Sequence, residues 1–195
     1  MQRKTFALLT LALALATAMV LPSQNASAFT PWGAVYDAAR DERSVGDITA
    51  DKKISTEIKS ALVNKDGKLG LAVKVYCYLG RVTLLGQLAD EKFKAFAEAT
   101  AKKQKGVKNV ATHWEAPGKT DTTAADLEIA AKLRTALVGD KELSATQIET
   151  EVFSGKVYLI GMVRSQKDAD RAVAHAHAVK GVTGVQSLLI PPRKK

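Results

Sequence analysis

The feature that most constrains this fold is an internal repeat with a constant spacing of 75 residues, from Asp51 and Asp126 onwards. Residues 80–86 read GRVTLLG and residues 155–161 read GKVYLIG, so the glycines coincide as well as the apolar positions. No gap is needed between the two copies. Chance does not give such agreement, so two homologous modules are predicted, at 51–115 and 126–191.

Both modules show the same order of predicted elements: helix, strand, strand, helix, strand. In the first module, helical spacing is seen at Ile54, Ile58 and Leu62. Strand alternation follows, first at Val73, Val75 and Cys77 and then at Val82 and Leu84. A second helix carries Phe93, Ala97 and Ala101, and a last short strand passes through Val110. The predicted fold class is α+β: two tandem αββαβ modules, each a small three-stranded sheet covered by two helices.

Glycines punctuate both modules at matching positions and are predicted to shape the turns. They are Gly80, Gly86, Gly106, Gly155, Gly161 and Gly181. The first module has only 65 residues, a size that gives a marginal core. We therefore expect the two modules to pack on each other or on a partner.

The first 28 residues have the pattern of a cleaved signal peptide. Arg3 and Lys4 precede a 16-residue apolar run that ends before Pro22, and the segment closes on Ala26-Ser27-Ala28. The rival reading, a membrane anchor, requires roughly 20 apolar residues. The remaining segments are an N-terminal helix and lead-in at 29–50, a linker at 116–125 and a basic tail at 192–195.

The chain is basic. Its formal net charge of +9 becomes +7 once Arg3 and Lys4 are removed with the signal peptide. A basic surface could meet nucleic acid, anionic lipid or an acidic protein. Export to the periplasm favours a phospholipid surface or envelope proteins over nucleic acid.

Several residues could carry chemistry, and each has a plainer structural explanation. Cys77 is the only cysteine and lies in the register of an apolar strand, which indicates a buried thiol. His175 and His177 diverge on a predicted helix and are expected to face solvent. The sequence 67–70, GKLG, resembles a nucleic-acid-binding G-x-x-G loop, but the second copy lacks both glycines. No cofactor, metal, small-molecule substrate or catalytic residue is predicted, and the chain is not expected to be an enzyme.

The order of these motifs resembles a known family. An amphipathic helix ending in Ala-Leu, then G-x-V-x-L-x-G, then a helix closed by G-V-x-x-V, is similar to the BON domain of exported bacterial proteins. Both copies match, and residues 41–46 resemble the lead-in of tandem BON proteins. The resemblance implies a periplasmic protein of envelope or osmotic stress maintenance that binds phospholipid without catalysis. The absence of a cysteine near residue 28 departs from the lipoprotein members.

Candidate membrane contacts come from aromatic and basic residues. Trp32 and Tyr36 lie on one face of a predicted helix, where they could sit at head-group depth. The basic residues are Lys102, Lys103, Lys105 and Lys108. Lysines at the end of a helix also complement its dipole, which is the plainer explanation. Trp114 is expected at the junction between the modules.

Two classes of function remain. The preferred one is peripheral binding to anionic phospholipid in the envelope. The alternative is a protein-interaction or chaperone-like periplasmic stress protein that uses exposed sheet faces.

Overall fold

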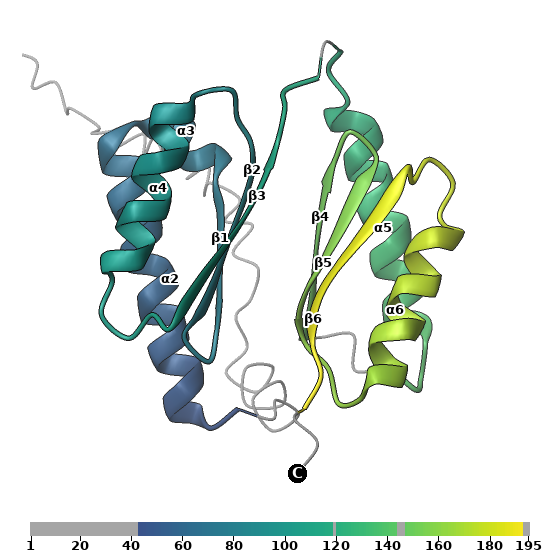
Figure 1. The fold of residues 1–195 in the computed structure, drawn as a ribbon. Coiled ribbons are helices and arrows are strands. Elements are labelled where there is room, and N and C mark those ends of the chain that lie inside the picture. The colour runs from purple at the N-terminus through teal and green to yellow at the C-terminus, as the bar shows by residue number, and fades with distance from the viewer. Residues whose placement is uncertain (1–42, 119, 144–146, 193–195) are drawn as a thin grey trace, which may run out of the picture.

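The computed structural model describes residues 43–118, 120–143 and 147–192. It shows two modules with their sheets towards each other and their helices on the outside (Figure 1). The predicted signal peptide, the segment 29–42 with Trp32 and Tyr36, and residues 193–195 of the tail lie outside the described residues. Within the described ranges, no helix is long and apolar enough to cross a membrane.

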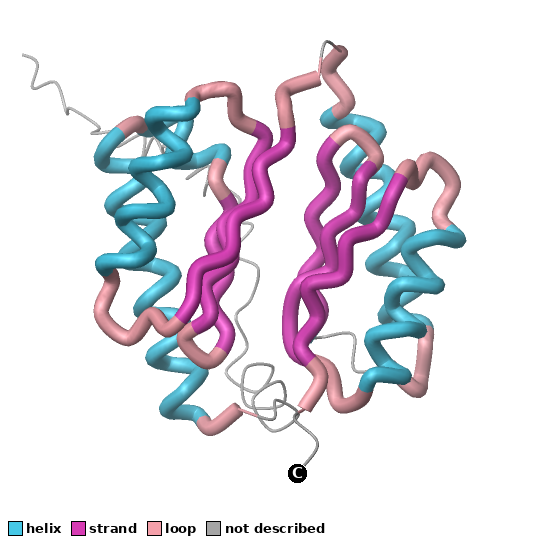
Figure 2. The backbone as a smooth tube through the Cα atoms, viewed as in Figure 1, coloured by secondary structure: helices cyan, strands magenta, loops and turns pink. Residues whose placement is uncertain are grey.

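The predicted order of elements is confirmed in both modules (Figure 2). The first module contains α2 (Val45–Lys65), α3 (Gly67–Ala72), β1 (Lys74–Tyr78), β2 (Arg81–Gln87), α4 (Glu91–Lys103) and β3 (Asn109–Glu115). The second contains α5 (Thr123–Gly139), β4 (Ile148–Phe153), β5 (Lys156–Met162), α6 (Gln166–Ala178) and β6 (Gly184–Ile190). The helices α2 and α5 begin inside the segments assigned above to lead-in and linker.

The beginning of α2 is set by a capping box. The Ser44 hydroxyl accepts a 3.1 Å hydrogen bond from the amide of Asp47, whose carboxylate accepts the Ser44 amide in return at 3.3 Å. These two bonds satisfy amide groups that no helical carbonyl can reach. The helix therefore starts six residues before the aspartate that opens the repeat alignment.

The prediction of a loop at residues 67–70 is wrong, because these residues form the start of the short helix α3. The carboxylate of Asp66 caps it by accepting the amide of Leu69 at 2.8 Å. Gly70 is buried against α2, where a Cβ atom would collide with the backbone of Leu62. The glycine therefore permits close packing of two helices, which explains the motif without a ligand.

Each sheet has the strand order expected of one folding unit used twice. β1 pairs antiparallel with β2, and β2 pairs parallel with β3. β4, β5 and β6 repeat this arrangement. Because β2 and β5 are central, β1, β3, β4 and β6 are edge strands.

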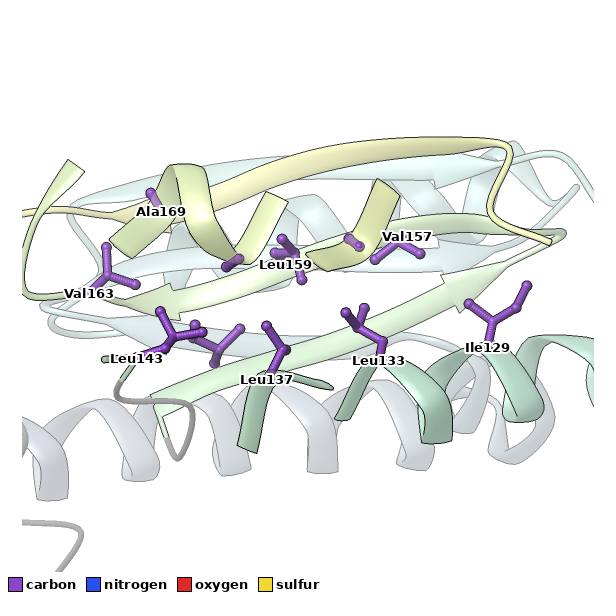
Figure 3. Close-up of a cluster of buried hydrophobic side chains, with 11 residues drawn as sticks. Ile129, Leu133, Leu137, Leu143, Val157, Leu159, Val163 and Ala169 are labelled. Atoms are coloured by element: carbon purple, nitrogen blue, oxygen red, sulfur yellow. The ribbon is translucent and has the colours of Figure 1, made fainter. Parts of the chain in front are cut away.

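The two cores are built from matching positions of the repeat. Ile58 and Leu62 in the first module, like Leu133 and Leu137 in the second, are 0% exposed. Figure 3 shows how the α5 side chains point onto the sheet and meet Val157 and Leu159. Alanines at matching positions of α4 and α6 are also fully buried, so these helices lie close to their sheets. The predicted apolar stripes are therefore confirmed.

A third cluster of buried side chains joins the two modules through the sheet faces that the helices leave uncovered. Leu85 and Ile160 occupy the same position of the repeat and are 0% and 1% exposed. Tyr158 is buried with them, and Tyr76, Tyr78, Phe153 and Leu188 pack around the cluster. The expectation that two small modules pack on each other is met, and these sheet faces are not free.

Candidate functional site

The most regular polar feature of the molecule is a carboxylate that holds each β-hairpin turn. In the first module, Asp51 of α2 accepts the amides of Leu79 at 2.7 Å and Gly80 at 2.9 Å. Both turn residues have positive φ, +54° and +77°, as a two-residue hairpin of this twist requires. The carboxylate therefore compensates for the left-handed conformation of Leu79, which a residue with a Cβ rarely adopts.

The second module repeats this arrangement. Asp126 of α5 accepts the amides of Ser154 and Gly155, each at 2.8 Å, and Ser154 has a φ of +50°. The repeat alignment pairs these aspartates, but their role depends on a contact between segments 28 residues apart, which periodicity does not reveal. They are scaffold residues whose hydrogen-bonding capacity is already used.

The first module adds two groups around its aspartate. Arg43 donates to Asp51 at 2.9 Å, and the Cys77 thiol donates to it at 3.2 Å. Burial opposes ionisation of Asp51, but the bonds from Gly80, Leu79 and Arg43 outweigh it and lower its pKa. Burial and the neighbouring Asp51 carboxylate raise the pKa of Cys77 to about 12. Cys77 is thus the buried thiol that the sequence predicts.

The six glycines do not all lie in turns. Gly80, Gly106, Gly155 and Gly181 have positive φ and occupy turns or loops. Gly86 and Gly161 lie inside β2 and β5 instead. A Cβ atom on Gly161 would collide with the carbonyl of Gln147, so this position accommodates a close backbone approach.

The four predicted lysines lie together at one end of the first module. Lys102 and Lys103 are in the last turn of α4, and Lys105 and Lys108 are in the loop that follows. All four are exposed. Lys102 also forms a 2.6 Å ion pair with Glu98, as a helix-stabilising lysine would.

This lysine cluster lies beside the hairpin turn and the start of the described chain. The amide of Lys108 donates to the carbonyl of Gly80 at 2.8 Å, and Gly80 is bound to Asp51, which also holds Arg43. The loop that carries Lys108 therefore lies at the same end of module 1 as the start of the described chain. At the four matching positions the second module has His177, Ala178, Lys180 and Thr183.

Two sets of tyrosine, glutamate and lysine connect the modules. The Tyr76 hydroxyl donates to Glu151 at 2.5 Å, and Lys74 lies 3.4 Å from the same carboxylate. Across the interface, Glu115 accepts from Lys156 at 2.7 Å and from the Tyr158 hydroxyl. Burial and Glu151 raise the pKa of Tyr76, whereas Lys156 and Tyr158 lower the pKa of Glu115.

Residues of β3 point alternately to the two sides of its sheet, and this corrects the placement of Trp114. Trp114 packs in the core of the first module, next to Gly86. His113 faces the other module instead, with its ring centroid 5.8 Å from that of Tyr158. Burial, with Lys156 nearby, lowers the pKa of His113.

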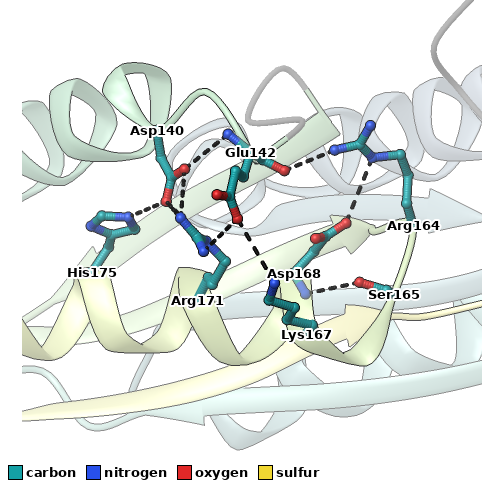
Figure 4. Close-up of polar contacts among 8 residues, drawn as sticks. All are labelled: Asp140, Glu142, Arg164, Ser165, Lys167, Asp168, Arg171 and His175. Atoms are coloured by element: carbon teal, nitrogen blue, oxygen red, sulfur yellow. Dashed lines mark hydrogen bonds and ion pairs between the residues drawn. The ribbon is translucent and has the colours of Figure 1, made fainter.

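A charged network unique to the second module holds the segment after α5 (Figure 4). Asp140 accepts from Arg171 at 3.0 Å and lies 2.8 Å from Nε2 of His175. His175 with Arg171 lowers the pKa of Asp140 to about 2. His175 is therefore half-buried and paired rather than fully solvent-facing, whereas His177 is exposed as expected. In the first module, Lys65 and Phe96 occupy the positions of Asp140 and Arg171 and form a cation–π contact.

The described residues hold no group of histidine, cysteine and acidic side chains that could bind a metal ion. One concave site among them is a groove of about 930 Å³ between α5, β4, the linker and Lys74. Three carboxylates line it: Asp126 and Glu151, which already hold the turn and the interface, and the exposed Asp121.

The repeated αββαβ unit, its capped hairpin and the paired sheets define a tandem two-module α+β protein. The BON domain family model matches residues 50–114 and 125–190, which are these two modules. The chain belongs to the BON-domain family.

Three known proteins illustrate the similarity. The chain is 30% identical to osmotically-inducible protein Y of Escherichia coli K12, over 94% of this chain and 93% of that protein. It is 28% identical to outer membrane lipoprotein DolP of Haemophilus influenzae, over 75% of this chain and 77% of the relative. The C-terminal domain of CdsD, a type III secretion protein of Chlamydia trachomatis, matches with a TM-score of 0.30 and 15% identity, over 73% of this chain and 67% of that structure.

Proposed function

We propose that this chain is an exported, non-enzymatic protein of the bacterial envelope that binds anionic phospholipid surfaces peripherally. The observation that carries the proposal is a group of four exposed lysines at the end of α4 and in the following loop, of which Lys108 adjoins the hairpin turn that Asp51 holds together with Arg43. The lysines alone are a diffuse charge, but Lys108 lies at the end of module 1 where the described chain begins, at Arg43.

The proposed membrane contact has a basic part and an aromatic part, and the expected binding energies require both. A lysine near an anionic membrane surface contributes about 1 kcal/mol, so four lysines give weak and salt-sensitive binding. Aromatic side chains at head-group depth add an apolar contribution that salt does not screen. We assign this second part to Trp32 and Tyr36.

The relatives support the location. One is named as osmotically inducible and another as an outer membrane lipoprotein. We propose a periplasmic location after cleavage behind Ala28, and attachment without a lipid anchor, because the only cysteine is Cys77, which is buried inside module 1. Sequencing the N-terminus of the secreted protein tests the cleavage position.

Flotation with vesicles of phosphatidylglycerol and phosphatidylcholine tests the function. Replacing Lys102, Lys103, Lys105 and Lys108 by glutamine should weaken binding by roughly three orders of magnitude at low salt, since each lysine contributes about 1 kcal/mol. The matched control replaces the same number of exposed lysines in module 2: Lys132, Lys141, Lys167 and Lys180. Equal losses of vesicle binding in the two variants would show that net charge, and not the lysine cluster of module 1, determines binding. Absence of binding by the parent protein at low salt would refute the function.

The apolar part is tested by Trp32→Ala combined with Tyr36→Ala. This variant should lose the binding that persists at high salt and keep its steep salt dependence. Unchanged vesicle binding would remove both aromatic residues from the contact.

A second candidate function, interaction with a protein partner, is favoured by the outer face of α5. Leu127 and Val138 are 66% and 60% exposed, and Ala131 between them is exposed too. Module 1 has the polar residues Lys52 and Thr56 at the positions that match Leu127 and Ala131. With the sheet faces buried between the modules, this helix stripe is where a protein partner would bind.

Val138→Ser combined with Ala131→Ser separates the two candidates. A loss of protein partners in periplasmic pull-downs with unchanged flotation supports the second function. A loss of flotation would instead move the lipid contact from the lysine cluster to α5.

A further inference from the structure

We propose that the groove between β4, α5 and the linker is a docking site for an extended, basic segment of a partner protein, which adds as a strand to the edge of β4. The groove is separate from the proposed lipid contact. It adjoins the linker that follows β3, whereas the lysine cluster precedes β3. The elements that build the groove come from both modules and from the linker.

The first observation is the unpaired edge of β4. Phe153 and Lys156 flank a two-residue turn and form a hydrogen-bonded pair, and such pairs alternate along an antiparallel ladder. The amide and carbonyl groups of Thr150 and Val152 therefore point away from β5. Among the described residues, none hydrogen-bonds to these outward backbone groups.

The second observation is that these same residues line the groove. Thr150 and Val152 form one wall of the 930 Å³ space, and Leu127 with Ala130 of α5 forms another. At the far end, Arg134 donates to the carbonyl of Ile148 at 3.1 Å and ends the free edge there. The open edge is thus short and confined to the groove.

These two observations together identify the class of occupant. A row of alternating amide and carbonyl groups is matched by another polypeptide backbone in extended form, and the exposed apolar wall suits alternate side chains. A lipid tail or an aliphatic ligand would leave the backbone groups unsatisfied at a cost of about 1–3 kcal/mol each.

The charge of the groove selects a basic segment. Asp121, Asp126 and Glu151 contribute carboxylates. Among the described residues that line the groove, the single cation is Lys74, which already lies 3.4 Å from Glu151. Hydrogen bonds from Thr123 lower the pKa of the exposed Asp121, so it stays ionised at neutral pH. A lysine or arginine side chain of the incoming strand would face this carboxylate.

The test uses a fluorescein-labelled peptide of alternating lysine and valine, with binding followed by fluorescence anisotropy. The matched peptides carry glutamate in place of lysine, or N-methyl groups on alternate amides. N-methylation removes the donors of the added strand and should weaken binding by at least about tenfold. The glutamate peptide should not bind detectably.

On the protein side, Thr150→Pro removes one edge amide, and an edge position tolerates proline. Its matched control is Val75→Pro at the same repeat position of the edge strand β1. Leu127→Lys, which introduces the residue of module 1 at an exposed site, should repel the basic peptide without affecting the fold.

Slower hydrogen exchange of the Thr150 and Val152 amides in the presence of the peptide would support the proposal. Equal binding of the N-methylated peptide, equal losses for Thr150→Pro and Val75→Pro, or absence of binding would overturn it.

Discussion

Tyr76 and Glu151 occupy the same position in the two copies of the repeat, and the Tyr76 hydroxyl donates a 2.5 Å hydrogen bond to the Glu151 carboxylate. Leu85 and Ile160 are likewise equivalent and share the buried cluster between the sheets. The two modules therefore meet through the same sheet face, as the halves of a symmetric dimer do. At this face, equivalent positions of the two modules carry different side chains that complement each other, such as Tyr76 and Glu151.

The Tyr76–Glu151 contact gives the first prediction. Tyr76→Phe keeps the ring but leaves Glu151 without its hydroxyl donor, and should lower the free energy of unfolding by about 1–2 kcal/mol. Urea denaturation measures this loss. The control Lys132→Gln breaks the exposed pair with Glu128 and should change stability by less than about 0.5 kcal/mol. An equal effect of both variants would contradict the role given to the interface.

The turn aspartates give the second prediction. Asp51→Ala removes the acceptor of two turn amides and of Arg43, and should cost about 3–4 kcal/mol. Asp126→Ala removes a more exposed carboxylate that has no arginine partner among the described residues, and should cost about 2 kcal/mol. Because the pKa of Asp51 is lowered on folding, its contribution is complete above about pH 4 and is lost as the pH falls through its folded value. Denaturant titrations at several pH values measure both losses. A larger loss for Asp126→Ala than for Asp51→Ala would contradict the prediction.

Much of this fold could be predicted from the sequence because it rests on local periodicity. Leu62, Leu137 and Ala97 lie in apolar stripes whose spacing already identifies a helix face. The role of Asp51 could not be predicted, since a carboxylate on a helix bonds a turn 28 residues away. The helix α3 was missed because Gly67 and Gly70 indicate a loop unless the close contact with Leu62 is known.

The candidate site divides in the same way. Composition and repeat comparison identify the lysines of module 1, because charge differences between copies are visible in the sequence. The burial of the sheet faces and the exposed stripe on α5 depend on how the modules pair. Trp114 and His113 illustrate this, since a one-residue difference along β3 decides which of them faces the other module.

The third prediction concerns Cys77. With a pKa of about 12, the thiol should react with a disulfide reagent at pH 8 only through opening of the module. Labelling should therefore be slow in the parent protein and become fast at the denaturant concentration that unfolds module 1. In Asp51→Ala the rate should rise together with the loss of stability. Rapid labelling of the folded parent protein would show that the strand is accessible.

The fourth prediction concerns pH and His113. The pKa of His113 is lowered below 6.5 in the folded chain, so the unfolded chain binds more protons at mildly acidic pH. The contribution of this site to stability is therefore complete above pH 6.5 and declines as the pH falls below it. His113→Leu introduces the residue found at the matching position, Leu188, and should flatten stability between pH 7 and pH 5. Persistence of the same slope in the variant would assign it to another group.

The most direct test of the membrane account is amide NMR of the protein with phosphatidylglycerol nanodiscs that carry a spin-labelled lipid. Membrane contact through the lysine cluster should give signal loss concentrated at Lys102–Lys108 and at the neighbouring turn Gly80–Arg81, with little change on α5 and α6. Signal loss confined to Leu127–Val138 of α5, or an unperturbed spectrum at low salt, would contradict it.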